Sequence, residues 1–249
     1  MAILEVSGLC KDYPAFHLNN VSFTLEKGRI MGFIGRNGAG KTTTLKSILN
    51  IVHPSAGQIR FFGMDLLPHE DEIKQRIGYA GGAVDFYKRK KIRKLIEVTR
   101  TFYPNWDDAA CRQWMEIFAL DENKTPAQLS EGMKVKLALT LALSHHAELL
   151  ILDEPTSGLD PVSREELLEA FTFLKDRGVT ILFSTHITSD LEKCADDITY
   201  IAGGRLIASE PMTAFMERGA AEGRGDTLEN IMVSYEKRSI HDFAAEVTI

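Results

Sequence analysis

The feature that most constrains the fold is a glycine-rich turn between an apolar run and a helical run. Residues 30–34 are Ile-Met-Gly-Phe-Ile, residues 35–42 read Gly-Arg-Asn-Gly-Ala-Gly-Lys-Thr, and residues 41–49 have a helical pattern. The turn fits G-x-x-x-x-G-K-[ST], in which backbone N–H groups cradle phosphates. A strand before the turn and a helix after it are the context that this pattern requires. The sequence therefore predicts an α/β fold with a nucleoside triphosphate site.

Each residue type in the turn serves the binding of a triphosphate. The three glycines are expected to take positive φ and to let backbone N–H groups and a helix N-terminus approach the phosphates. Lys41 is expected to place its charge on the β- and γ-phosphates, while the hydroxyl of Thr42 reaches Mg²⁺ and that of Thr43 the phosphates. The predicted nucleotide-binding residues of the turn are Gly35, Asn37, Gly38, Ala39, Gly40, Lys41, Thr42 and Thr43.

Two carboxylates follow a second apolar strand. Residues 149–152 are Leu-Leu-Ile-Leu, and Asp153 and Glu154 come directly after them. Ligands of open α/β sheets bind at the carboxyl ends of the strands, so both side chains are expected beside the phosphates. We expect Asp153 to hold Mg²⁺ and Glu154 to act as the general base that polarises the attacking water. The alternative is a pair of ordinary surface carboxylates at a strand end.

Three further segments complete a pattern that resembles the ATP-binding cassette (ABC) family. Residues 129–134 read Leu-Ser-Glu-Gly-Met-Lys, residues 155–160 read Pro-Thr-Ser-Gly-Leu-Asp, and Thr185 and His186 follow one strand later. The resemblance covers most of the chain, from about residue 3 to residue 206. It implies an α/β P-loop NTPase of ABC type, with a mainly parallel core sheet, an N-terminal antiparallel β subdomain and an inserted helical subdomain.

The resemblance also implies roles for residues outside the phosphate turn. His186 resembles the switch histidine, which contacts the γ-phosphate and holds the attacking water in line. Ser130 and Gly132 match the signature motif, which reaches the partner's γ-phosphate across a head-to-tail dimer. Asp160 resembles the aspartate that contacts the partner, and Tyr13 the aromatic residue that stacks on adenine. For His186 and Tyr13, purely structural roles are the alternative.

The chain departs from the family pattern in two places. The family's signature motif is Leu-Ser-Gly-Gly-Gln, and this chain has Glu131 and Met133 at the third and fifth positions. Where the family usually reads Ile-Gly-Tyr-Leu-Pro-Gln, residues 77–82 of this chain read Ile-Gly-Tyr-Ala-Gly-Gly. Gly82 therefore stands in place of the glutamine whose side chain, in the family, touches Mg²⁺ and the membrane subunit. Glu131 is expected either to face outward at a helix N-terminus or to repel the partner's phosphates. Gly82 is expected to weaken the coupling of hydrolysis to a membrane subunit.

A basic run and a histidine pair stand outside these motifs. Residues 88–94 read Lys-Arg-Lys-Lys-Ile-Arg-Lys, which favours a solvated helix face. Contact with a membrane subunit or anionic headgroups, and contact with nucleic acid, are the alternatives. His145 and His146 are adjacent and point in different directions on a helix, so we expect no metal site there.

Composition limits the class of protein. The 44% hydrophobic and 26% charged residues are typical of a soluble globular chain, and the net charge of −6 gives no support to broad nucleic-acid binding. The longest apolar run, residues 137–143, is far shorter than the ~20 residues of a membrane span. The N-terminus lacks the pattern of a signal peptide, and three cysteines without C-x-x-C spacing are expected to be reduced thiols in the cytosol.

The organisation of the chain follows from its runs and breaks. An ABC-type ATPase domain is expected over residues 1–218, with a helical subdomain at about residues 88–146, where few strand-like runs occur. Residues 163–166, Ser-Arg-Glu-Glu, form a capping-box pattern that predicts a helix start. Residues 219–249 are expected to form a linker, flexible over residues 219–225, and a short C-terminal helix.

The sequence as a whole favours the ATPase subunit of an ABC transporter, peripheral on the cytoplasmic face of the membrane through a separate permease. ATP and Mg²⁺ are its expected cofactors. Its expected partners are an integral membrane permease and a second ATPase subunit, in a homodimer or a heterodimer, with no nucleic acid. Residues 228–232 resemble the C-terminal extension of the exporter-type, drug-resistance branch. The alternatives are an ABC-type ATPase that acts on DNA or ribosomes, and an ATP-gated binding module with low turnover.

Overall fold

A mainly parallel sheet forms the centre of the computed structural model, which describes residues 1–81 and 89–236. Within those residues its strand order is β10-β9-β3-β8-β7-β6, and only β10 runs antiparallel to its neighbour. The central strands are buried on both faces and mostly apolar. The strands are β3 (Ile30–Ile34), β6 (Ile77–Gly81), β7 (Leu149–Asp153), β8 (Thr180–Thr185), β9 (Asp197–Ala202) and β10 (Arg205–Pro211).

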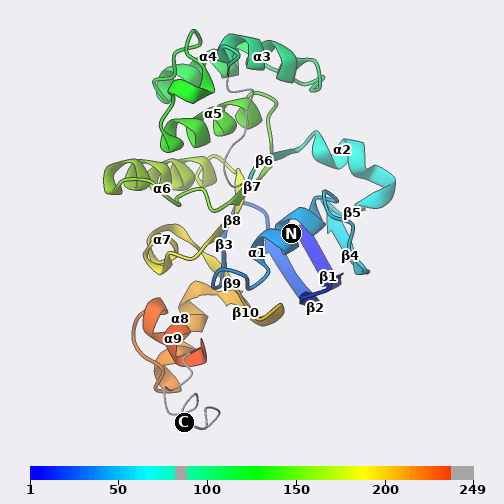
Figure 1. Cartoon of the computed structure of the whole chain (residues 1–249), viewed down its shortest axis with the longest axis vertical. Helices are drawn as coiled ribbons and strands as arrows, with labels where there is room; N and C mark the ends of the chain where they lie inside the picture. The colour runs from blue at the N-terminus through cyan, green and yellow to red at the C-terminus, as the bar shows by residue number, and fades with distance from the viewer. Residues whose placement is uncertain (82–88, 237–249) are drawn as a thin grey trace.

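A second, antiparallel sheet lies beside the first, as the resemblance implied (Figure 1). It has the order β2-β1-β4-β5 in the described part of the chain. One apolar core joins the two sheets and buries α1 (Lys41–Ile48); within it the rings of Phe23 and Phe33 lie 5.6 Å apart. The strands are β1 (Ala2–Tyr13), β2 (Phe16–Glu26), β4 (Ala56–Phe61) and β5 (Met64–Asp65), followed by η1 (Leu67–His69) and α2 (Glu70–Lys74).

A helical lobe occupies one end of the molecule, at the top of Figure 1. It comprises α3 (Ile92–Arg100), α4 (Asp108–Ile117), η2 (Pro126–Gln128) and α5 (Glu131–Leu143). The apolar helix α5 packs against β6 and α6, which fixes the lobe to the parallel sheet. The described residues 89–146 contain helices and turns without strands, as expected for the inserted segment.

The C-terminal part adds α6 (Pro161–Lys175), α7 (Thr188–Cys194), α8 (Met212–Ala221) and α9 (Leu228–Glu236). Two expectations are corrected here. Helix α6 begins at Pro161 rather than at the capping-box pattern, because the side chain of Asp160 already caps it. The expected flexible linker from Gly219 is shorter, because α8 continues to Ala221 and a Cβ at Gly219 would lie 2.3 Å from the side chain of Ile231 in α9. Gly219 thus serves close helix packing.

Candidate nucleotide-binding site

The glycine-rich turn connects the end of β3 to the start of α1, as predicted. Gly38 and Gly40 have φ of 81° and 112°, in the left-handed region. The expectation of positive φ was wrong for Gly35, which is absent from the positive-φ residues. A Cβ at Gly35 would lie 2.3 Å from the carbonyl oxygen of Ile201, so close backbone approach to β9 requires this glycine.

A pocket of about 640 Å³ opens over this turn. It brings together nine of the predicted residues, from the ends of β1, β7 and β8 as well as from the turn. Four residues that the sequence analysis did not select also line it: Ala15, Phe16, Arg36 and Ser157. The predicted residues in the pocket are Tyr13, Asn37, Gly38, Gly40, Lys41, Thr42, Thr43, Glu154 and His186.

Other predicted residues lie outside the pocket lining. Gly35 and Ala39 belong to the turn but are buried and do not line the pocket. The Asp153 side chain is 4% exposed, and its carboxylate accepts a hydrogen bond of 2.6 Å from the hydroxyl of Ser184 on β8. Asp153 therefore stands behind the pocket wall, while its neighbour Glu154 faces the pocket.

Three side chains from distant parts of the sequence meet inside the pocket. One carboxylate oxygen of Glu154 lies 3.1 Å from the ammonium of Lys41, and the other lies 2.7 Å from Nδ1 of His186. The ammonium of Lys41 also donates a 2.7 Å hydrogen bond to the carbonyl oxygen of Gly35. Lys41 is almost fully buried, so its charge is compensated by these groups. The predicted base, switch histidine and phosphate lysine thus form one polar chain.

The backbone at Glu154 is unusual. Its φ is 53°, in the left-handed region, which costs a non-glycine residue about 1 kcal/mol or more. The N–H of Glu154 donates to the hydroxyl of Ser184 at 2.9 Å, and that hydroxyl donates to Asp153. These bonds tie the strained turn to β8. Backbone strain of this kind is concentrated at functional sites, and no sequence pattern predicted the left-handed conformation of Glu154.

The signature segment forms the start of α5, away from the pocket. Ser130 is the N-cap of α5, and its hydroxyl accepts a hydrogen bond from the N–H of Met133 at 3.2 Å. The carboxylate of Glu131 lies 2.5 Å from the ammonium of Lys134, within the first turn of the helix. About half of the Glu131 side chain is exposed, and its effect on a partner's phosphates stays a prediction.

Asp160 lies next to this signature segment. Its carboxylate caps α6 by accepting hydrogen bonds of 3.0 Å from the N–H groups of Val162 and Ser163, and the bonds to Ser163 contribute most to lowering the Asp160 pKa. A Cβ on Gly132 would lie 3.4 Å from the Cβ of Ser163, so the α5 and α6 starts adjoin. We name Ser130, Gly132 and Asp160 the signature patch; none of the three lines the nucleotide pocket.

Tyr13 and Phe16 bound the pocket on the side of the antiparallel sheet. Tyr13 ends β1 with 39% of its surface exposed, and the ammonium of Lys11 lies 5.4 Å from the centre of its ring. Phe16 opens β2, and its ring would lie 2.8 Å from a Cβ on Gly40. Two aromatic rings therefore stand beside the phosphate turn, where the sequence had predicted one.

The remaining predictions fall elsewhere. Gly82, the departure from the family's glutamine, lies outside the described residues, as does Lys88 at the start of the basic run. Within α3, the ammonium of Lys94 pairs with Glu97 at 2.6 Å, as on a solvated helix face. His145 and His146 lie in the turn after α5 and not on a helix, where they had been expected. His145 is buried and stacks on another ring, whereas His146 is exposed, so the two point apart.

Among the described residues, no helix combines the length and the apolar character needed to cross a membrane.

Comparisons with known proteins agree with this geometry. Residues 18–157, more than half of the chain, match the model of the ABC transporter family. The chain is 34% identical, over 97% of its length, to the bacitracin transport ATP-binding protein BcrA of Bacillus licheniformis, of which it covers 81%. It is 37% identical, over 80% of its length, to a Nod factor export ATP-binding protein of Burkholderia lata, of which it covers 67%. It is 30% identical, over 98% of its length, to the probable multidrug transporter protein YbhF of Escherichia coli, but spans only 43% of that protein.

Solved structures resemble the fold closely. An ATP-binding subunit of an ABC transporter superposes with a TM-score of 0.83 and 28% identity, over 94% of this chain and 100% of that one. The dimeric ATP-binding cassette MJ0796, bound to ADP and Pi, gives a TM-score of 0.74 over 84% of this chain and 98% of that one. At 20% identity this second likeness shows the fold alone. The chain belongs to the ABC transporter family, as an ATP-binding and ATP-hydrolysing subunit.

Proposed function

We propose that the pocket of about 640 Å³ binds ATP and that the Lys41–Glu154–His186 chain is its catalytic centre. The observation that carries the proposal is the meeting of these three side chains from β7, β8 and the phosphate turn. A triphosphate with several negative charges would compete with Glu154 for the ammonium of Lys41. Tyr13, which lines the pocket and is 39% exposed, offers a ring for the adenine to stack on.

Glu154 is the proposed general base and His186 its positioning partner. The carboxylate of Glu154 faces the pocket and can accept a proton from a water that attacks the γ-phosphate. The 2.7 Å contact with His186 holds the carboxylate in one orientation while leaving the imidazole at the pocket wall. Positioning of the attacking water is a recurring part of phosphoryl-transfer sites.

The residues present fit a magnesium ion. Mg²⁺ prefers hard oxygen ligands and keeps several waters, and both a hydroxyl and a carboxylate are available here. Thr42 lines the pocket at the first turn of α1, and Asp153 stands just behind the wall with a carboxylate fixed by Ser184. We assign Thr42 as a direct ligand and Asp153 as a ligand through water. When bound, the ion would neutralise charge on the β- and γ-phosphates.

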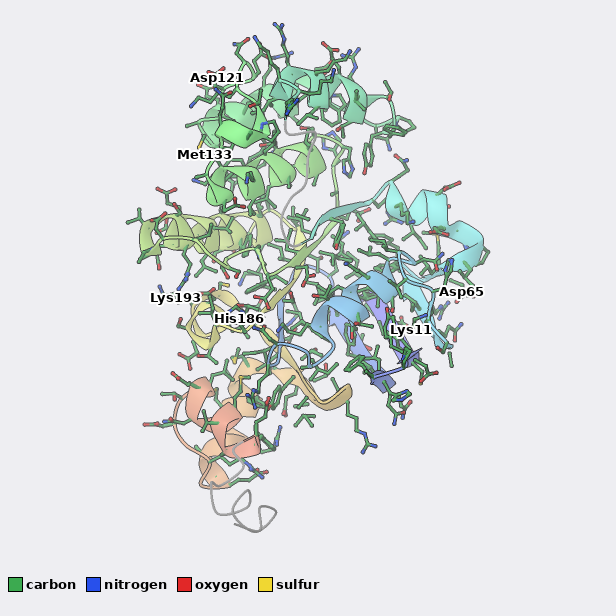
Figure 2. All side chains as sticks on the ribbon, viewed as in Figure 1. Lys11, Asp65, Asp121, Met133, His186 and Lys193 are labelled. Atoms are coloured by element: carbon green, nitrogen blue, oxygen red, sulfur yellow. The ribbon has the colours of Figure 1, made fainter. Side chains whose placement is uncertain are left out.

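A second copy of this chain is the proposed partner in hydrolysis. The signature patch presents the capped N-terminus of a 13-residue helix but does not line the chain's own pocket. Figure 2 shows Met133, on the first turn of α5, and His186 in separate parts of the molecule. Since one chain carries both halves, a head-to-tail dimer of two copies would complete two sites, with the patch of each facing the ATP of the other.

The proposed biological role is export of a solute through a separate membrane permease, with this subunit on the cytoplasmic face. The name of one relative, a Nod factor export protein, supports export, and that of another, a bacitracin transport protein, supports transport of a solute. Affinity-tagged protein, purified from detergent-solubilised membranes of its own cells, should retain a multi-span membrane protein. Recovery of the tagged chain with ribosomes or DNA and without a membrane protein would contradict this role.

Lys41→Ala tests the nucleotide site directly. Because the ammonium acts on the phosphates in the ground state as well as in the transition state, ATP binding itself should weaken, by about tenfold or more. The measurement is calorimetric titration with ATP, with Lys46→Ala as the control, since Lys46 lies on the same helix outside the pocket lining. Unchanged ATP affinity in Lys41→Ala would remove this pocket from nucleotide binding.

A further inference from the structure

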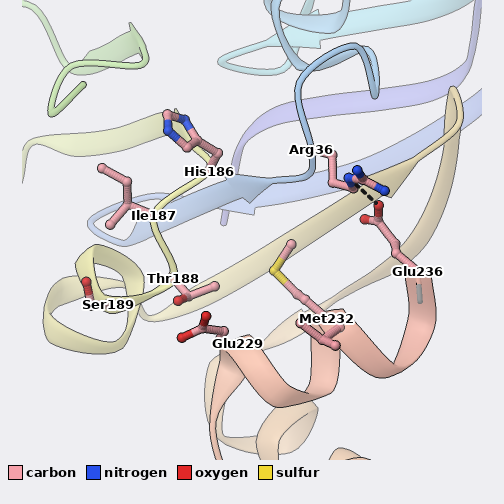
Figure 3. A pocket seen from close by; sticks show the side chains of 9 residues that line it. Arg36, His186, Ile187, Thr188, Ser189, Glu229, Met232 and Glu236 are labelled. Carbon is pink, nitrogen blue, oxygen red and sulfur yellow. Dashed lines mark ion pairs between the residues drawn. The ribbon is translucent and has the colours of Figure 1, made fainter. Parts of the chain in front are cut away.

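The C-terminal helix α9 lies against the nucleotide site. A second pocket, of about 680 Å³, separates α9 from the phosphate turn and the loop after β8 (Figure 3). It shares Arg36 and His186 with the nucleotide pocket, so the two pockets are neighbours. Carboxylates of α9 line it together with apolar side chains, among them Glu229, Glu236 and Met232.

One ion pair bridges α9 and the phosphate turn. Nε of Arg36 lies 3.5 Å from a carboxylate oxygen of Glu236, as Figure 3 marks. The Arg36 side chain is 73% exposed, whereas that of Glu236 is only 17% exposed. The guanidinium therefore has room to move, and the carboxylate does not.

A buried residue of the sheet fixes the carboxylate of Glu236. Its second carboxylate oxygen accepts a 2.7 Å hydrogen bond from the hydroxyl of Tyr200, a fully buried residue of β9. The ring of Tyr200 packs against Phe215 and Tyr235, at centre distances of 6.3 and 5.8 Å. Burial raises the Tyr200 pKa above its usual value, so the hydroxyl keeps the proton that it donates.

The other end of α9 contacts the helix that follows His186. The N–H of Leu228 donates to a carboxylate oxygen of Glu192 on α7 at 2.8 Å. Leu228 and Ile231 are fully buried against the core. Helix α9 thus touches both parts of the chain that would meet the γ-phosphate, the phosphate turn and the segment beginning at His186.

We propose that Glu236 is a positioning residue that competes with the nucleotide phosphates for Arg36, so that α9 responds to nucleotide binding. The proposal rests on the proposed function of the neighbouring pocket. Arginine binds phosphate in a bidentate manner, whereas the mostly exposed Arg36 side chain approaches Glu236 through a single 3.5 Å contact, so phosphates can displace the carboxylate. The bound phosphates turn the Arg36 guanidinium away from Glu236, and the C-terminal end of α9 loses its contact with the turn.

Nucleotide affinity tests the competition, with the non-hydrolysable analogue AMP-PNP as the probe. Glu236→Gln keeps an oxygen for the Tyr200 hydroxyl and removes the charge, so the Kd for AMP-PNP in calorimetry should fall about threefold. Glu229→Gln is the matched control, because it removes the same charge from the same helix and pocket without an Arg36 contact. An equal fall of the Kd in both variants would mean that the loss of any negative charge near the pocket has this effect, and would overturn the proposal.

Two further measurements make the outcome specific. In an Arg36→Ala background, Glu236→Gln should no longer change the Kd. Hydrogen exchange of residues 228–236 should become faster when AMP-PNP is added to the wild-type protein, and should not change in Arg36→Ala. If AMP-PNP fails to bind the wild-type protein, the proposed function fails. If AMP-PNP binds but neither exchange in α9 nor the Kd of Glu236→Gln changes, only the role of Glu236 fails.

Discussion

Lys41, Glu154 and His186 lie far apart in the sequence, and a single carboxylate connects them. Glu154 reaches both partners because its backbone takes a left-handed conformation, which hydrogen bonds to Ser184 support. Asp153, one residue earlier, faces the other way and is buried against the same serine. Two adjacent carboxylates thereby acquire different environments, one facing the pocket and one behind its wall.

Glu154→Gln should nearly abolish ATP hydrolysis and leave ATP binding intact. The amide keeps the size of the carboxylate but cannot accept the proton of the attacking water, and loss of a general base costs typically 10²–10⁴-fold in rate. Steady-state ATPase assays and ATP titrations measure the two quantities. Glu165→Gln, on the exposed side of α6, is the control and should retain activity. Turnover of Glu154→Gln within tenfold of the wild type would exclude Glu154 as the base.

At the scale of elements, the junction between α5 and the parallel sheet contains an unusual pair. His145, just after α5, stacks on Tyr103 with ring centres 3.7 Å apart, and Nδ1 lies 3.1 Å from the carbonyl oxygen of Gln75. Burial lowers the His145 pKa from 6.5 to about 4. The neutral imidazole is thus part of the packing that fixes the helical lobe to β6.

The pH dependence of stability follows from this histidine. Because its pKa is lower in the folded state, the unfolded chain binds more protons between pH 6.5 and 4, and stability is lost as pH falls through that range. From pH 7.5 to 5 the loss attributable to His145 should be about 2 kcal/mol. Urea denaturation at both pH values should show a smaller drop for His145→Gln, whereas the control His146→Asn should keep the wild-type drop. An equal drop in His145→Gln would assign the pH dependence to other groups.

Local patterns predicted those elements that depend on neighbouring residues. The sequence predicted β3, the turn and α1 because their signals are consecutive: an apolar run at residues 30–34, then the glycines and Lys41 of the turn, then a helical pattern of residues. For Lys41, Glu154 and His186, the sequence could predict only that the three residues lie at one edge of the sheet, and not that their side chains contact one another. The Arg36–Glu236 pair and the Tyr103–His145 stack join segments separated in sequence, and no local pattern encodes such contacts. The linker from Gly219 was predicted too long because a glycine that allows helices to approach looks the same in sequence as a flexible one.

At the scale of the whole molecule, the nucleotide pocket and the signature patch do not meet within one chain. The nucleotide pocket lies at the carboxyl ends of the parallel strands, and the signature patch lies at the starts of α5 and α6. The α5 start carries the Glu131–Lys134 pair, in which opposite charges lie 2.5 Å apart. A second copy in head-to-tail orientation would bring the patch of one chain to the ATP of the other. Hydrolysis then becomes a property of the dimer.

Mixing two inactive variants tests this central claim most directly. Glu154→Gln disables the pocket, and Ser130→Asp keeps the N-cap of α5 while placing a negative charge against the partner's phosphates. Each variant alone should lack ATPase activity. When equal amounts of the two are mixed before ATP is added, half of the dimers are mixed and each has one intact site, so about a quarter of the wild-type activity should return. A mixture no more active than either variant alone would contradict a site shared between two chains.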